Sequence, residues 1–233
     1  MLAVALAAAL TPNFAFAEQG DWVVRLRAVN INPSESSKLG EQTNKTLPAG
    51  ADAMTLYGND NANLSVDSNT IPELDISYYV TKNIAIELIL ALGTKHDVSI
   101  SGLNNGLVDS KKLGEVNLLP PTLTAQWHFR PDQTFDPYVG AGVSYIRAMD
   151  NGLTAVTEDS VKHPIRIDRN MWGPALQAGF DINLKDGWMI NFDVKKIWFE
   201  TDVKLNAYGT GYKKIDELDI NPLVVGIGFG KRF

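Results

Sequence analysis

Hydrophobic and polar residues alternate from Asp21 to the end of the chain, with a period of two instead of the 3.6-residue period of a helix. Because successive side chains of a strand point to opposite faces, this alternation predicts strands that separate an apolar phase from a polar one. A slip in the alternation near Lys195 and Lys196 suggests a β-bulge. Eight strands are expected, over approximately residues 22–32, 73–80, 84–99, 115–129, 137–145, 172–183, 188–195 and 218–233.

The connections between these strands alternate between short and long. The short ones cover residues 81–83, 130–134 and 185–187, and the long ones cover 33–71, 100–113, 151–165 and 206–217. The long segments are rich in Gly, Asn, Ser and Asp, which is typical of loops. Short turns at one end and long loops at the other are the arrangement of outer-membrane barrels. The sequence therefore predicts an all-β fold, an eight-stranded antiparallel transmembrane β-barrel with short periplasmic turns and long extracellular loops.

The two faces of the strands differ in chemistry. One face carries Leu, Ile, Val, Ala, Phe and Trp, and the other carries Arg, Glu, Asp, Gln, Thr and Gly. A soluble barrel would point the apolar face inward, whereas a membrane barrel points it toward lipid. Aromatic residues near the short turns favour lipid outside, because such residues form girdles at membrane interfaces. The expected girdle consists of Trp22, Tyr78, Trp127, Phe129, Trp188 and Phe233.

Charge and cysteine content exclude several classes of function. The net charge is −6, from 21 basic and 27 acidic residues, which argues against a nucleic-acid partner because such proteins present a basic stripe. The chain has no cysteine, so it has no disulfide framework, no thiolate metal site and no cysteine nucleophile. No motif for a cofactor is present, and the three histidines lack the spacing of metal ligands.

The N-terminal segment has the features of an export signal. Residues 2–10 are a continuous run of Leu, Ala and Val, and Ala15-Phe16-Ala17 fits a signal-peptidase site. We expect residues 1–17 to be a signal peptide and residues 18–233 to be one barrel domain. No Lys or Arg precedes the apolar run, and a short buried helix of a soluble domain is the alternative interpretation.

The inward face of the predicted barrel has two zones. Eight strands leave room only for side chains or one small ligand. Near the short turns, polar residues are expected to form an ion-paired plug with Arg25 at its centre, which fills and closes the barrel. Its members are Arg25, Asp75, Glu87, Gln126, Asp181, Asp193 and Lys195. Nearer the long loops the face is less polar, which predicts either an apolar vestibule or packing between loops and barrel, formed by Ile31, Ile89, Ala91, Val116, Leu118, Pro120 and Met171.

Several short motifs, taken in order, resemble those of the OmpW family of outer-membrane proteins. They are Leu119-Pro120-Pro121-Thr122-Leu123, Ala125-Gln126-Trp127 and Pro137-Tyr138-Val139-Gly140-Ala141-Gly142, and the likeness covers nearly all of residues 18–233. The resemblance implies an eight-stranded barrel with a narrow apolar channel for uptake of small hydrophobic molecules. It also implies outer-membrane lipid and lipopolysaccharide as surroundings, and recognition of Phe233 by the barrel-assembly machinery, although Lys231 departs from that signal.

The resemblance further implies sideways release of the solute into the bilayer through a gap between strands. Members of the family tend to have proline where this chain has Gly93, which makes Gly93 the candidate position of the gap. Glycine weakens strand pairing but keeps the backbone N–H that proline lacks. Pro120, Pro121 and Pro222 are other candidate breaks.

Two other classes of function are considered from the sequence. A structural or interaction barrel would bind host surfaces, phage or lipopolysaccharide through its loops and would transport nothing. An enzyme of the outer membrane would need a group such as Ser99, Ser101 and His96, which has no recognisable spacing here. Acidic residues in the first long loop, Asp52, Asp60 and Asp67, could bind a divalent cation, but acidic loops are usually only solvated.

Overall fold

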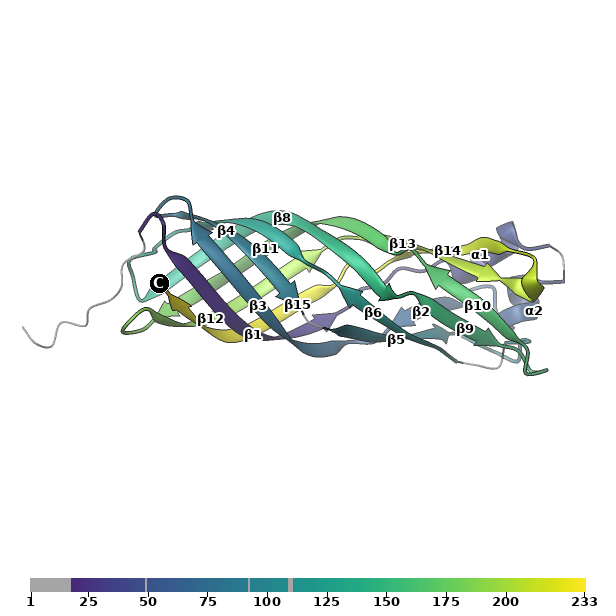
Figure 1. Cartoon of the computed structure of the whole chain (residues 1–233). Coiled ribbons are helices and arrows are strands. Elements are labelled where there is room, and N and C mark those ends of the chain that lie inside the picture. Colours follow the sequence, from purple (N-terminus) through teal and green to yellow (C-terminus); the bar gives the residue numbers. More distant parts are fainter. Residues whose placement is uncertain (1–17, 49, 92, 109–110) are drawn as a thin grey trace, which may run out of the picture.

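The computed structural model describes residues 18–233 except residues 49, 92 and 109–110, so the predicted signal segment 1–17 lies outside the described residues. Strands dominate, with two short helices and one 3-10 turn (Figure 1). The strands are β1 (Trp22–Asn32), β2 (Asn63–Val66), β3 (Asn69–Tyr79), β4 (Ile84–Ala91), β5 (Thr94–Ser101), β6 (Lys112–Leu119), β7 (Thr122–His128), β8 (Phe135–Asp150), β9 (Gly152–Val156), β10 (Lys162–Ile167), β11 (Asn170–Asn183), β12 (Trp188–Ile197), β13 (Glu200–Asn206), β14 (Tyr212–Asp219) and β15 (Leu223–Arg232). The helical segments are α1 (Leu39–Thr46), α2 (Ala53–Tyr57) and the 3-10 turn Ala207–Gly209.

Eight of these strands form a closed antiparallel barrel, which confirms the predicted fold. Strand β1 pairs with β3 on one side and with the last strand, β15, on the other, so the first and last strands close the barrel. Around the barrel the order is β1, β3, β4, β7, β8, β11, β12 and β15. The C-terminus and the short turns lie at the same end of the barrel (Figure 1).

Alternation along each barrel strand sends apolar side chains outward and polar side chains into the lumen. In β1, Trp22, Val24 and Leu26 are exposed, whereas Arg25 and Arg27 are buried. The predicted aromatic girdle is on the outer surface, and Trp22 packs against Tyr78 with ring centroids 4.9 Å apart. The prediction that lipid wets the apolar face is therefore confirmed. Among the described residues, no helix is both long and apolar enough to cross a bilayer.

Three of the four long connections contain regular structure that the sequence did not predict. Helices α1 and α2 and strand β2 lie within 33–71, β9 and most of β10 lie within 151–165, and most of β14 lies within 206–217. Strands β9, β10, β13 and β14 form a four-stranded sheet, while β2, β5 and β6 extend the barrel sheet. Both groups prolong the cylinder away from the C-terminus, with α1 and α2 at the far end (Figure 1). We call this region the extension. It forms because short alternating stretches, such as Leu153 with Ala155 and Ile165 with Ile167, bury one face in a shared apolar core.

Three other sequence expectations also need correction. The predicted strands 84–99 and 115–129 are each divided in two: β4 ends at Ala91 and β5 begins at Thr94, and β6 ends at Leu119 and β7 begins at Thr122. The bulge expected near Lys195 is absent from the described pairing of β12, because Lys195 lies opposite Gln177 and Ile197 opposite Ala175 in regular register. The apparent slip has another cause. From Lys195 toward the extension the interior of the barrel becomes apolar. Ile197 and Phe199 therefore point inward and are buried.

Candidate functional site

The lower half of the lumen, which is the half nearer the short turns, holds a network of buried ionic side chains. The Arg25 guanidinium donates to Asp181 Oδ2 at 2.7 Å, to Ser77 Oγ at 2.8 Å and to Glu87 Oε1 at 3.3 Å. These partners come from three strands, so one side chain from β1 joins β3, β4 and β11 across the barrel. Arg25, Asp181 and Glu87 are all inaccessible to solvent, and buried charges of this kind are tolerated only when paired.

Arg27 is a second centre of this network, and sequence reasoning did not select it. Its guanidinium lies 2.5 Å from Asp75, 3.4 Å from Glu87 and 3.4 Å from Asp193. It also donates to the amide oxygen of Asn191 at 3.1 Å. The signal was present in the sequence, because Arg27 shares the inward parity of Arg25 on β1.

Amide side chains connect the remaining members. Gln126 donates to Glu87 at 2.7 Å, and Gln177 donates to Glu87 at 2.9 Å and to Asp193 at 2.7 Å. Lys195 reaches Glu73 at 3.3 Å. The structure thus brings together all seven residues predicted for the plug and adds Arg27, Glu73, Ser77, Gln177 and Asn191 to them. We refer to this network as the plug.

Below the plug, at the end with the short turns, a histidine lies among acids. His128 Nδ1 is 2.7 Å from Asp136 Oδ2, and the ligand atoms of His128, Asp136 and Asp181 lie within 4.8 Å of one another. Asp181 uses both carboxylate oxygens on Arg25. A divalent cation there would lie beside a guanidinium that repels it, so this group fits an ion-paired cluster better than a metal site.

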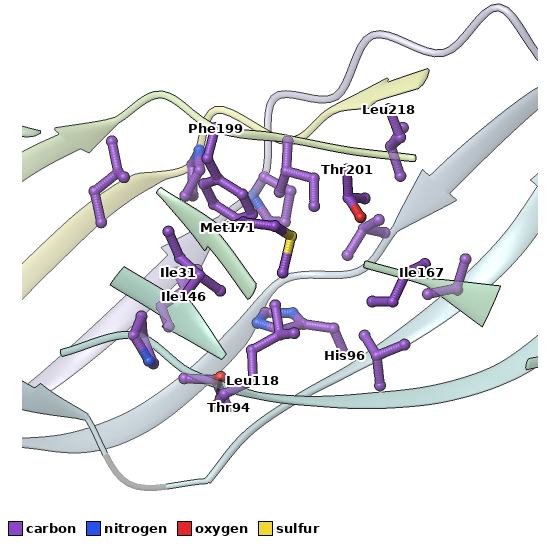
Figure 2. A pocket seen from close by; sticks show the side chains of 18 of the residues that line it. Ile31, Thr94, His96, Leu118, Ile146, Ile167, Met171, Phe199, Thr201 and Leu218 are labelled. Atoms are coloured by element: carbon purple, nitrogen blue, oxygen red, sulfur yellow. Dashed lines mark hydrogen bonds between the residues drawn. The ribbon is translucent and has the colours of Figure 1, made fainter. Parts of the chain in front are cut away.

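Above the plug lies an apolar cavity with about 970 Å³ of empty space, including the part that opens to solvent. Figure 2 shows Met171 at the centre of the labelled side chains, with Phe199 on one side and His96 and Leu118 on the other. Six of the seven residues predicted for the vestibule line it, namely Ile31, Ala91, Val116, Leu118, Pro120 and Met171. Ile89 is buried in the barrel interior but does not line this cavity.

Many other lining residues were not selected from the sequence. Leu64 and Leu153 lie in segments that were interpreted as loops, and Leu218 and Ile220 lie in the predicted strand 218–233. Others, such as Phe199, lie in segments assigned neither to a strand nor to a loop. A smaller apolar cavity lies farther along the extension, with about 550 Å³ of empty space, and Leu64 lines both cavities. Together they place apolar space from the helical end of the extension down to the plug. The missed residues of the first cavity include Leu64, Leu153, Ile167, Phe199, Val203, Leu218 and Ile220.

The barrel wall beside the cavity contains an interruption in strand pairing. The ladder between β4 and β7 ends at Ile89 and Thr122, and the next pair along the same seam is Thr94 with Leu118. No described residue of 90–93 pairs with 119–121. Two prolines, which have no N–H to donate, occupy positions 120 and 121, and Gly93 has a φ of +70°. The cavity reaches this interruption, because residues on both of its sides line the cavity.

Other positions singled out from the sequence do not assemble into sites. His96 points into the cavity, whereas Ser99 and Ser101 occupy the opposite face of β5, so the three cannot form a catalytic group. Asp52 caps α2 by accepting from Thr55 N at 2.8 Å. Asp60 bonds to Asn44, and Asp67 bonds to the Asp97 backbone.

Two other predicted elements can be placed in the fold. Pro222 does not open the wall, since its carbonyl accepts a hydrogen bond from Ile197 N. Phe233 is exposed as a member of the girdle, and Lys231 lies over the Trp188 ring, 4.8 Å from its centroid. The role of Phe233 in assembly stays a prediction.

Comparison with known proteins agrees with this geometry. A sequence model described as the OmpW family matches residues 18–233. The outer membrane protein W of Vibrio cholerae is 34% identical, covering 100% of this chain and 97% of that protein. The crystal structure of the outer membrane protein OprG from Pseudomonas aeruginosa superposes with a TM-score of 0.74 at 26% identity, covering 95% of this chain and 99% of that one. The dibenzothiophene metabolism operon protein PahQ of Pseudomonas aeruginosa is 23% identical, covering 94% of this chain and 91% of that protein. The chain is accordingly a protein of the bacterial outer membrane.

Proposed function

Because this chain belongs to the OmpW family, we propose that it is a passive channel that takes up small apolar molecules and releases them sideways into the outer membrane. The observation that carries this proposal is the apolar cavity, which lies directly on the plug and reaches the interrupted seam in the wall. A solute in the cavity meets apolar side chains on most sides and charged groups below. The relative named for dibenzothiophene metabolism, itself an apolar aromatic compound, supports this class of solute.

The plug makes straight passage unfavourable. An apolar solute that moved down the axis would have to displace ion pairs such as Arg25 with Asp181 and Arg27 with Asp75, which have no exposure to solvent. Separating buried pairs leaves uncompensated charges, and that costs several kcal/mol on the order-of-magnitude scale for such groups. The bilayer beside the seam offers the solute an apolar phase at no such cost. Sideways exit is therefore the favoured path.

The seam has the local chemistry that an exit needs. Leaving the ladder incomplete exposes backbone groups, and proline reduces that cost because it has no donor to lose. A Cβ added at Gly93 would meet no atom within 4 Å, so there is open space on that side of the seam. Valine at Gly93 would fill part of this space and would also be strained, since β-branched residues disfavour positive φ.

Uptake measurements on Gly93→Val test the proposal. The matched control is Gly209→Val, because Gly209 has a φ of +73°, also has open space around it and lines neither cavity. We expect Gly93→Val to lower barrel-dependent uptake of an apolar probe several-fold and Gly209→Val to leave it unchanged. Heat-modifiable migration on gels checks that both variants are folded. Unchanged uptake in Gly93→Val would count against an exit at this position.

We also propose contact with lipopolysaccharide, the feature that an interaction barrel would share. Tyr145 and Trp172 form an aromatic pair on the outer wall, with ring centroids 4.5 Å apart, and Trp172 is 65% exposed. Arg147 and Arg169 lie just beyond this pair, both exposed and neither ion-paired with a described residue. Basic side chains next to an aromatic girdle suit the phosphate groups of the outer leaflet.

A further inference from the structure

The floor of the first cavity carries an ion pair. The rest of its lining is apolar except for four other polar residues, Thr94, His96, Thr122 and Thr201. Glu73 from β3 and Lys195 from β12 are the carboxylate and the ammonium among its lining residues, and both are buried. Lys195 Nζ lies 3.3 Å from Glu73 Oε2. These two side chains are the upper members of the plug, so they form the surface on which a molecule in the cavity would rest.

Both groups have unused hydrogen-bonding capacity. An ammonium has three donors, and Lys195 makes one hydrogen bond to the described residues, to Glu73. Its other ionic neighbour, Asp193, is 3.9 Å away and thus beyond hydrogen-bond distance. On the carboxylate, Oε1 of Glu73 is buried without a hydrogen-bond donor among the described residues, although Arg27 Nε lies 3.2 Å from it. The floor therefore offers a donor and an acceptor side by side.

The charge around the floor selects against an anion. The lumen of the barrel buries six carboxylates and four cations, counted over the described residues: Glu73, Asp75, Glu87, Asp136, Asp181 and Asp193 against Arg25, Arg27, Lys195 and Arg232. A ligand carboxylate could pair with Lys195 but would face Glu73 and the surplus of acids behind it. A ligand ammonium would face Lys195 itself. An uncharged hydroxyl avoids both repulsions, and it can accept from Lys195 while donating to Glu73.

We propose that the cavity takes apolar molecules carrying one uncharged hydroxyl group, an aliphatic or aromatic alcohol, with the hydroxyl docked on the Lys195–Glu73 pair. This inference rests on the proposed function and names the class of solute within it. The apolar part of the molecule packs along Met171, Phe199 and Leu118, and the unbranched thioether of Met171 adapts to different shapes. A hydrocarbon of the same length fills the same space without using the floor.

Uptake of probes of equal chain length tests the proposal in cells that have this barrel as their route of entry. The probes are isotopically labelled 1-octanol, n-octane, octanoate and octylamine. The double variant Glu73→Gln/Lys195→Met removes both charges together. We expect its barrel-dependent uptake of 1-octanol to fall about tenfold, because a tenfold change corresponds to the loss of roughly one charge-assisted hydrogen bond. Uptake of n-octane should stay within about twofold of the parent, since the variant leaves the cavity walls intact.

Control variants separate the role of the floor from general damage. Ile167→Val removes one methylene from the cavity wall and should change uptake of 1-octanol and n-octane equally. If the double variant is not heat-modifiable, the single variants Glu73→Gln and Lys195→Arg replace it. Gln keeps an acceptor oxygen at position 73 and Arg keeps a cationic donor at position 195. A smaller but still 1-octanol-specific loss is expected from Glu73→Gln.

Two kinds of outcome overturn the proposal about the floor, and a third concerns the lateral channel. Equal losses for 1-octanol and n-octane, or no loss for either, would show that the floor does not recognise a hydroxyl. Preference of the parent protein for octanoate or octylamine would show that it selects a charged group instead. The lateral channel, rather than the role of the floor, would be refuted by two results together. These are no barrel-dependent uptake of n-octane by the parent protein and unchanged uptake of 1-octanol in the Gly93→Val variant.

Discussion

Replacement of Arg27 by methionine probes how strongly the plug stabilises the barrel. Arg27 lies within 3.4 Å of four carboxylates, yet three of these have another cation or donor. Glu73 keeps Lys195, Glu87 keeps Arg25, and Asp193 keeps Lys195 and Tyr138. Asp75 is the exception, because its side-chain hydrogen bond and its ion pair with described residues are both to Arg27, and its Oδ1 has no hydrogen-bond donor among them even in the parent protein.

The magnitude follows from this single orphaned carboxylate. Removing one partner of a buried ion pair costs about 3–5 kcal/mol of stability. We therefore expect Arg27→Met to lower the free energy of unfolding by about this amount, and Arg27→Met/Asp75→Ala to recover most of the loss because the unpaired charge is gone. The control is Lys204→Met, which breaks ion pairs at 2.8 Å and 3.4 Å on the partly exposed surface of the extension. Such pairs contribute at most about 1 kcal/mol.

Urea unfolding in lipid vesicles, followed by tryptophan fluorescence, gives these free energies, because tryptophans line the lipid-facing surface. Two results would refute the reasoning. One is a loss below about 1 kcal/mol in Arg27→Met, which would mean that water or neighbouring groups compensate Asp75. The other is a double variant as unstable as the single one, which would mean that Arg27 acts through packing alone.

Further predictions concern other parts of the chain. Burial raises the pKa of Asp216, which fastens the start of α1 to β14 by accepting hydrogen bonds from Ser37 and Lys38. Its contribution to the stability of this contact is thus full below the ordinary carboxyl pKa of about 3.9 and is lost as pH rises through the raised value. Hydrogen exchange in α1, corrected for intrinsic rates, should therefore become faster over that pH range. In Asp216→Asn the exchange rate should no longer depend on pH in this way. Gly228→Val should block barrel closure, because a side chain there collides with the Leu26 carbonyl of β1, and its product should migrate on gels as unfolded protein whether boiled or not. Replacement of Arg147 and Arg169 by glutamine should weaken binding of purified lipopolysaccharide several-fold without changing heat-modifiable migration, and equal binding would refute the proposed contact.

Much of the barrel could be predicted from the sequence because lipid imposes a strict two-residue period. Every second residue of a barrel strand must be apolar, so parity alone assigned Arg25 and Glu87 to the lumen and Trp172 to the outer wall. The same parity would have assigned Arg27 and His128 to the lumen. The members of the plug could therefore be found without a structure, whereas their pairing depends on register across the barrel.

The extension could not be predicted in the same way. Its strands are short and rich in residues that also form loops, so the alternation of Leu153 with Ala155 was too brief to distinguish from chance. The lumen changes from polar to apolar at Ile197 and Phe199, and in the sequence this change looked like a slip of register. Where the lumen becomes apolar, inward-facing residues are apolar instead of polar, although side chains still alternate between the two faces of the strand.

Anomalous diffraction from crystals soaked with a bromoalkane tests the central claim most directly, because bromine marks the path of the solute. The account predicts bromine in the cavity beside Met171 and at the seam near Pro120, and none below Lys195. Bromine within the plug or among Tyr79, His128 and Asp136 would show that solutes pass straight through the barrel, and would contradict the account.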